Sequence, residues 1–113
     1  TNVMAKYALN KISIKLDGKD AYHNDSSIEH IINEDKSIEK TLCIGNLICL
    51  EETLNNEADD LDFEEKVEVY KKSRYLQVKK FCEKHNVFSI DDIEKRAIDL
   101  ATYYYDNILR NSN

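Results

Sequence analysis

The chain has 113 residues, with 16 basic and 22 acidic side chains and a formal net charge of -6. This length allows one compact domain with a modest core and is too short for two independent domains. The acidic balance is unfavourable for sequence-independent attraction to a phosphate backbone, which normally requires a basic patch. The three cysteines, Cys43, Cys49 and Cys82, form no close Cys-x-x-Cys pair. This argues against a disulfide framework and a tetrahedral zinc site, and it predicts three reduced core residues.

No run of 18 apolar residues is present, and the first residues, TNVMAKYALNK, lack the apolar core and cleavage site of a signal peptide. We therefore expect no membrane association and a soluble, cytoplasmic protein. Because the sequence starts at Thr1 instead of Met and ends in NSN, we also expect a piece of a longer protein, although a truncated expression product would look the same.

Residues 1–26 predict a leading helix and a polar loop. NVMAKYALNKI favours a helix, whereas ISIKL at 12–16 alternates like a short strand, and the pattern leaves open where one gives way to the other. Proline is absent and glycine occurs only at positions 18 and 45, so the chain has few residues that break helices. We therefore expect a mostly helical protein.

Residues 27–61 differ in kind and predict two short strands followed by a short helix. IEHII at 28–32 and NLICL at 46–50 are apolar, rich in β-branched residues and bounded by polar clusters or Gly45. EETLNNEADD at 51–60 begins with glutamates, which the dipole of a helix favours in its first turn. The acidic residues at its end lack the glycine and the ligand spacing of an EF-hand, so we interpret them as a solvated helix end.

Residues 62–110 predict two long amphipathic helices. The first covers residues 63–86 with a bend near Ser73, and its lysines indicate either a solvated surface or a basic face against DNA. The second runs from Ile90 to Leu109 after a near capping box of Ser89 and Asp92. Its three consecutive tyrosines, 103–105, point in three directions, so at most one or two share a face with the core; stacking on nucleic-acid bases is the alternative. The predicted class is α+β and mostly helical.

Four polar residues are expected to meet around the two strands. Glu29 and His30 end the first strand, Asn46 starts the second, and Asn55 lies on the helix that follows. Mg²⁺ takes oxygen ligands and keeps several waters, so one carboxylate and one amide oxygen would suffice to hold it. A neutral imidazole beside the ion could accept a proton from an attacking water. Adjacent Glu and His are common in proteins, however, and a half-buried histidine bonded to a carbonyl is the structural alternative.

Five segments in this order resemble the HNH nuclease domain at the C-terminus of GmrSD-type restriction enzymes. They are IEHIINED, IGNLICL, TLN, FEEKVEVYKKS and SIDDIEKRAIDLA. In that family an acidic-His-Ile-x-Pro segment precedes Gly-Asn-Leu-x-Leu-Leu, a second Asn nine residues after the first, and Phe-x-x-Lys. Here Asn46 to Asn55 has that interval, FEEK lies at 63–66, and an Ile-x-x-Arg runs from Ile93 to Arg96. The resemblance covers about residues 28–105.

This resemblance implies a ββα-metal core that hydrolyses DNA phosphodiester bonds with one divalent ion, Mg²⁺ or else Mn²⁺. It implies that His30 is the general base, that Asn46 braces the histidine loop, and that Glu29 and Asn55 bind the metal. Lys66 lies at the position of the family's lysine and is expected to contact a substrate phosphate. The implied role is restriction or defence against phage, with a covalently linked or associated partner domain that selects the target. Nothing in the sequence sets the oligomeric state, and the other histidines, at positions 23 and 85, are expected to have no function.

The chain also departs from the family pattern. Asn33 stands in place of the usual Pro, Ser27 in place of a frequent Asp, and Asp60 in place of a common Asn. A shift of one residue in the comparison would make Asn56 the ligand instead of Asn55. The changes at Ser27 and Asn33 and the acidic balance favour the alternative hypothesis, a catalytically degenerate HNH fold that acts as a protein-interaction or regulatory module. A helical adaptor unrelated to HNH nucleases would require the order of motifs to be coincidence.

Overall fold

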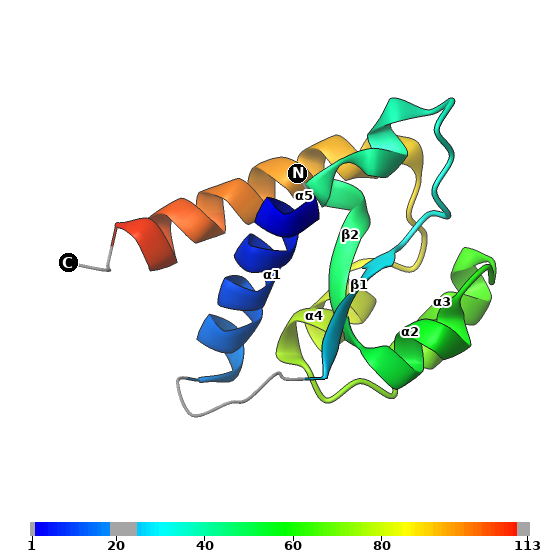
Figure 1. Ribbon diagram of the computed structural model, residues 1–113, viewed down its shortest axis with the longest axis horizontal. Helices are drawn as coiled ribbons and strands as arrows, with labels where there is room; N and C mark the ends of the chain where they lie inside the picture. The colour runs from blue at the N-terminus through cyan, green and yellow to red at the C-terminus, as the bar shows by residue number, and fades with distance from the viewer. Residues whose placement is uncertain (1, 19–24, 111–113) are drawn as a thin grey trace.

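The computed structural model describes residues 2–18 and 25–110 and has a two-stranded hairpin surrounded by helices (Figure 1). In chain order the elements are α1 (Asn2–Asp17), β1 (Ser26–His30), 3-10 turns at Glu39–Leu42 and Ile44–Asn46, β2 (Leu47–Glu51), α2 (Glu52–Ala58), α3 (Phe63–Tyr70), α4 (Leu76–Lys84) and α5 (Ile90–Tyr104), which continues as a π-helical turn, Tyr105–Leu109. The predicted class, a mostly helical α+β fold with two strands followed by a helix, is confirmed. Within the described ranges, no helix combines the length and apolarity required to cross a bilayer.

The hairpin forms the centre of the molecule. β1 and β2 are antiparallel, with Ser26 opposite Glu51 and His30 opposite Leu47. In Figure 1 the hairpin stands between α1 on one side and α2 and α3 on the other. All five residues of β2 are buried, whereas β1 is mostly half-buried. A strand covered on both faces needs apolar residues at consecutive positions, which explains the run LICL.

The first helix is longer than the sequence pattern predicts. α1 continues to Asp17, so the short strand expected at 12–16 is wrong. Leu9 and Ile12 are buried three residues apart, while Lys11 and Lys15 are exposed, which is helical and not strand periodicity. Gly18 ends the helix with a φ of 106° and donates its N–H to the Ile14 carbonyl, as a glycine in the left-handed region typically does after a helix.

The helix expected over residues 63–86 is instead two helices, α3 and α4, separated near the predicted bend. The buried Glu51 carboxylate accepts hydrogen bonds from Ser73 Oγ at 2.6 Å and from the Arg74 N–H at 2.9 Å. The Tyr75 N–H donates to Ser73 Oγ. These bonds satisfy main-chain donors that a continuous helix would pair internally, so the chain can turn here.

The last helix holds the start of β2 in place. α5 begins at Ile90 as predicted, and the Asp92 carboxylate accepts from the Ser89 N–H. Buried Arg96 donates through Nη1 to the carbonyls of Gly45, at 3.0 Å, and Leu47, at 2.7 Å. Burial lowers the pKa of this guanidinium to about 10. A Cβ on Gly45 would lie 2.0 Å from the Ile93 carbonyl oxygen, so only glycine fits this close approach.

The remaining predictions concern cysteines, histidines and tyrosines. All three cysteines are free, but Cys43 is exposed between the two 3-10 turns, so its assignment to the core is wrong. Burial raises the pKa of the Cys49 thiol to about 11.

Of the two histidines expected to have no function, His85 packs against Phe81 and Phe88, and residue 23 lies outside the described ranges. In the tyrosine run, 103 and 104 are half-buried and 105 is exposed.

Candidate active site

Most of the predicted site residues line one polar depression beside the hairpin. Glu29 and His30 come from β1, Asn55 from α2 and Lys66 from α3, and together they border a cavity of about 320 Å³. The remaining lining residues belong to β1, the loop that follows it, and the end of α2: Ile28, Asn33, Glu34, Asp59 and Asp60. The structure thus brings four of the five predicted residues together, whereas Asn46 is fully buried and does not line the depression.

The Glu29 carboxylate is buried and held at one of its two oxygens. Only 3% of the residue is exposed. Tyr70 donates its hydroxyl to Oε2 at 2.5 Å, and the Lys66 ammonium lies 3.1 Å from the same atom. Burial, followed by the negative charge of Glu29, raises the pKa of Tyr70 well above its usual range, so the hydroxyl remains a donor at neutral pH. Within residues 2–18 and 25–110, the hydrogen bond and the ion pair of this carboxylate are both at Oε2, which leaves Oε1 as the oxygen for a further ligand.

Lys66 lies in the floor of the depression and not on the surface of α3. It is only 1% exposed, and its Nζ also donates to the His30 carbonyl at 2.6 Å. The lysine therefore joins the carboxylate of Glu29 to the main chain of the predicted base. The expected contact between Lys66 and a substrate phosphate stays a prediction.

Asn46 braces the chain just beyond the histidine. Its Oδ1 accepts from the Ile32 N–H at 2.8 Å, and its Nδ2 donates to the carbonyls of Ile32, at 2.8 Å, and Thr41, at 3.0 Å. The side chain is fully buried. These three bonds hold the segment after His30 against the turn that precedes β2, which is the arrangement that the predicted bracing role requires.

Asn55 is anchored through its amide nitrogen. Nδ2 donates to Ser27 Oγ at 2.9 Å and to the Ile28 carbonyl at 3.1 Å. Both donor positions are directed at β1, so Oδ1 is left as an acceptor on a side chain that lines the depression. Asn56 is exposed and does not line it, which favours Asn55 over its neighbour.

The donor set fits a hard cation better than zinc. Among the described residues, no group of three or more His, Cys, Asp or Glu side chains could hold an ion. A carboxylate oxygen of Glu29 and the amide oxygen of Asn55 are the types of ligand that Mg²⁺ takes, with water or phosphate oxygens completing the shell. Exposed Glu34, Asp59 and Asp60 add negative charge at the rim, which attracts cations.

The three departures from the family pattern have structural roles. Ser27 accepts the bond from Asn55 and donates its own hydroxyl to the Leu50 carbonyl at 3.1 Å. Asn33 donates to the Leu61 carbonyl at 3.2 Å and ties the loop after β1 to the link between α2 and α3. Asp60 has a φ of 63°, a conformation that Asn and Asp tolerate better than most residues.

Sequence reasoning missed Tyr70, although a signal was present. Lys66 and Tyr70 are four residues apart on α3, so their side chains extend from the same face of the helix. Both reach Glu29 Oε2. The sequence signal was the spacing: a tyrosine hydroxyl one helical turn after the motif lysine can reach the same partner as the lysine.

The comparison with protein families identifies the chain. The model described as GmrSD restriction endonucleases, C-terminal domain, matches residues 2–103. The chain belongs to this family. Comparison with curated proteins and with solved structures gave no match. The GmrSD C-terminal domain is part of restriction endonucleases, for which DNA is the substrate. The resemblance found in the motifs is therefore confirmed, and the match extends over α1, which the motifs did not include.

Proposed function

We propose that this GmrSD C-terminal domain is a metal-dependent HNH endonuclease that hydrolyses phosphodiester bonds in DNA, as part of a restriction or anti-phage defence protein. One observation carries the proposal: a carboxylate, an imidazole and an amide from two different elements line a single polar depression, and Asn46 fixes the loop beside them. The family supports the reaction class, because its members are parts of restriction endonucleases.

In the proposed mechanism His30 is the general base. The neutral imidazole accepts a proton from a water molecule as the water oxygen forms its bond to phosphorus and the bond to the leaving oxygen breaks. Lys66 fixes the main chain of His30 through the carbonyl. Asn46 fixes the two residues that follow, Ile31 through its own main-chain carbonyl and Ile32 through its side-chain amide. Lys66 also places positive charge in the floor of the depression, beneath the expected position of the phosphate.

Glu29 and Asn55 would hold the divalent ion, Mg²⁺ or Mn²⁺. A bound ion neutralises charge that develops on the phosphate in the transition state. The contribution of the chain is to orient the ligands: Tyr70 and Lys66 hold one oxygen of Glu29, and Ser27 holds the amide nitrogen of Asn55. The proposal includes a partner domain, linked or associated, that selects the DNA target and offsets the net charge of -6.

Plasmid nicking tests the proposal. The purified chain is incubated with supercoiled plasmid and Mg²⁺ or Mn²⁺, and the rate is compared with that in EDTA. We expect metal-dependent nicking that falls about 10²- to 10⁴-fold in His30→Ala, the range typical of a lost general base. His85→Ala is the matched control, because that ring packs against Phe81 and Phe88 and does not line the depression. Thermal melting establishes that both variants fold.

The degenerate module is the second candidate function. The observation that favours it is the Lys66 ammonium, which occupies the position next to Glu29 where a cation is expected. If neither this chain nor a longer protein that contains it cuts DNA, and calorimetry detects no divalent-ion binding, the nuclease proposal is wrong and the regulatory module is the better account.

A further inference from the structure

His30 lies between two depressions and not at the edge of one. The first is the acidic depression described above. The second, of about 310 Å³, lies between α1 and β1 and is lined by Val3, Lys6, Ser27, Ile28 and His30. Its lining is mainly apolar, and Lys6 and His30 are its polar groups besides the Ser27 hydroxyl. We refer to it as the α1 pocket.

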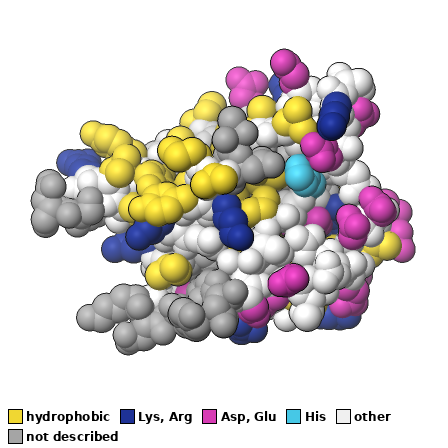
Figure 2. Space-filling model, in the orientation of Figure 1, with side chains coloured by type: hydrophobic (Ala, Val, Ile, Leu, Met, Phe, Trp, Pro, Cys, Tyr) yellow, Lys and Arg dark blue, Asp and Glu magenta, His cyan; other side chains and the backbone are white. Residues whose placement is uncertain are grey.

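The two depressions differ in charge. The acidic depression contains four carboxylates and one buried ammonium. Among the described residues, no carboxylate lines the α1 pocket, and Lys6 is the one fixed charge. Figure 2 shows the same division on the surface: acidic side chains gather over the α2 and α3 side, and hydrophobic ones over α1 and α5. His30 therefore borders a region suited to a cation and a region suited to an anion with an apolar body.

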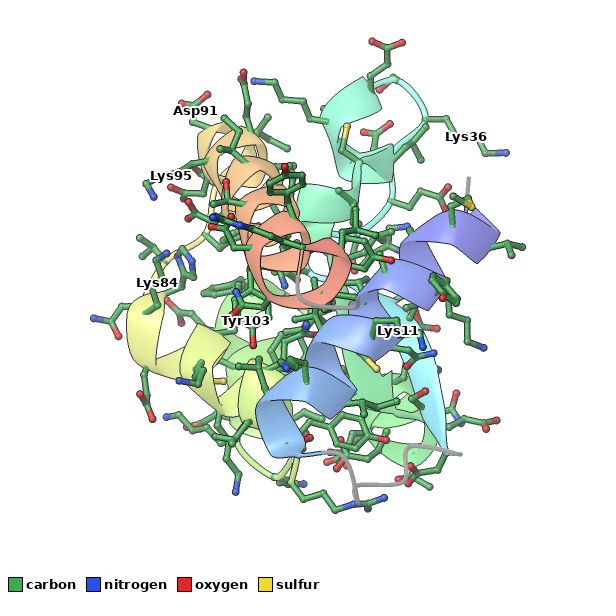
Figure 3. The ribbon with its side chains drawn as sticks, turned by 90° about the vertical axis from the view of Figure 1, so that its left-hand side faces the viewer. Lys11, Lys36, Lys84, Asp91, Lys95 and Tyr103 are labelled. Carbon is green, nitrogen blue, oxygen red and sulfur yellow. The ribbon has the colours of Figure 1, made fainter. Side chains whose placement is uncertain are left out.

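Lys6 is available to bind an anion. It is exposed on α1, and within residues 2–18 and 25–110 it forms no ion pair. Several other surface lysines face carboxylates: Lys71 with Glu68, Lys72 with Glu57, and Lys84 and Lys95 with Asp99. Figure 3 shows Lys84 and Lys95 on the side of α4 and α5, away from β1. Of the lysines in residues 63–86, Lys84 at the end of α4 thus lies away from β1.

We infer that the α1 pocket binds the nucleotide next to the scissile phosphate, with Lys6 on its phosphate and Val3 and Ile28 against the sugar or base. This inference rests on the proposed nuclease function and extends it. A DNA strand has anionic phosphates alternating with flat, largely apolar groups, and the α1 pocket offers one cation beside apolar side chains. Val3 is 80% exposed, so its surface is open to such a contact. Because His30 borders both depressions, a phosphate bound next to the His30 imidazole would lie between the proposed metal ligands and Lys6.

DNA-binding affinity as a function of salt tests the role of Lys6. Binding of a fluorescent duplex is followed by anisotropy in the His30→Ala background with Mg²⁺, where cutting is blocked. We expect Lys6→Ala to raise the Kd about three- to tenfold at low salt and to reduce the slope of log K against log salt by about 0.9, the loss of one phosphate contact. Lys6→Arg should restore both. Lys15→Ala is the matched control: it removes the same charge from an exposed position of the same helix, about half a turn around its axis from Lys6.

Nicking kinetics give the second readout. In the chain with His30 intact, Lys6→Ala should raise KM and leave the affinity for the divalent ion unchanged, since Lys6 does not line the acidic depression. If the chain cuts DNA and Lys6→Ala and Lys15→Ala have equal Kd values and salt slopes, the α1 pocket is not the subsite and the nuclease proposal stands. If no variant binds or cuts DNA, either as this chain or within a longer protein that contains it, both proposals are wrong. Circular dichroism melting of each variant separates a binding loss from unfolding.

Discussion

Arg96 and Lys66 are both buried cations that donate to main-chain carbonyls around the hairpin, but they have different surroundings. Arg96 binds the carbonyls of Gly45 and Leu47, and within the described ranges it pairs with no carboxylate. Lys66 binds the His30 carbonyl and also pairs with Glu29, whose second oxygen has no hydrogen-bond partner in the part of the chain that the structure describes. The Arg96 arrangement includes no carboxylate that could take a further ligand. The Lys66 arrangement contains a carboxylate that can still take a ligand, which distinguishes a structural cation from one that belongs to a site.

The largest expected effect on stability is at Gly45, whose carbonyl accepts a hydrogen bond from Arg96. A methyl group on Gly45 would lie 2.0 Å from the Ile93 carbonyl oxygen, and neither backbone group can rotate away. We expect Gly45→Ala to lower the free energy of unfolding by more than about 4 kcal/mol or to prevent folding. Urea unfolding measures this loss. Gly18→Ala is the control, because its Cβ would meet nothing within 4 Å and only the left-handed backbone costs about 1–2 kcal/mol.

The second buried cation is tested by Lys66→Met, which leaves the Glu29 carboxylate buried without its ammonium partner. We expect the free energy of unfolding at neutral pH to fall by about 3–5 kcal/mol, as when one partner of a buried ion pair is removed. Excess Mg²⁺ should restore more stability to this variant than to the wild type, because an ion bound only by the folded state raises its stability. Urea unfolding measures both gains. An equal gain would show that the loss of Lys66 does not strengthen ion binding, and no gain in either protein would show that Glu29 is not a metal ligand.

Arg96→Met tests the comparison between the two buried cations, and we expect it to lower the free energy of unfolding somewhat less than Lys66→Met does. Removing the guanidinium leaves the carbonyls of Gly45 and Leu47 without their donor, which we expect to cost about 2–3 kcal/mol. Excess Mg²⁺ should give this variant no more stability than it gives the wild type. A preferential recovery with Mg²⁺ would mean that the two cations are coupled and that their separation into structure and site is wrong.

Tyr70→Phe should have the smallest effect and a characteristic pH dependence. Loss of the hydroxyl that donates to Glu29 is expected to cost about 1–2 kcal/mol at pH 7. The folded-state pKa of Tyr70 is raised by burial, then by Glu29, whereas an unfolded tyrosine titrates near 10. The hydroxyl therefore contributes fully below about pH 10, and its contribution is lost as the pH rises further. Unfolding free energies of the two proteins should converge above that pH; a constant difference would contradict this.

Local chemistry made much of the fold predictable. Apolar runs bounded by polar residues placed the two strands within a few residues, and Ser89 with Asp92 placed the start of α5. The end of α1 was not predictable, because ISIKL satisfies strand alternation as well as the helical spacing of Leu9 and Ile12. The separation of α3 from α4 depends on Glu51, more than twenty residues earlier, so no local pattern contains it.

The candidate site, too, was predictable only in part from the sequence. Glu29, His30, Asn46 and Asn55 were predicted because a family pattern fixes their intervals. The structure places Glu29, His30 and Asn55 around one depression, and buried Asn46 bonds to Ile32 in the loop that follows β1. The position of Lys66 was not predictable from the amphipathic pattern of α3, in which a lysine indicates solvent. Its burial follows from its pairing with Glu29, and such a contact between distant residues is visible only once the chain is folded.

The bonds of the Lys66 ammonium have a thermodynamic consequence for ion binding. Because one ammonium holds both Glu29 and the main chain of His30, the proposed ligand and the proposed base are already ordered in the ion-free chain. Sites that fold around their ion show a large negative heat-capacity change and an unfavourable entropy when the ion binds. Here calorimetry of Mg²⁺ binding should give a heat-capacity change close to zero, since the hairpin is a preformed scaffold and the ion would displace only water.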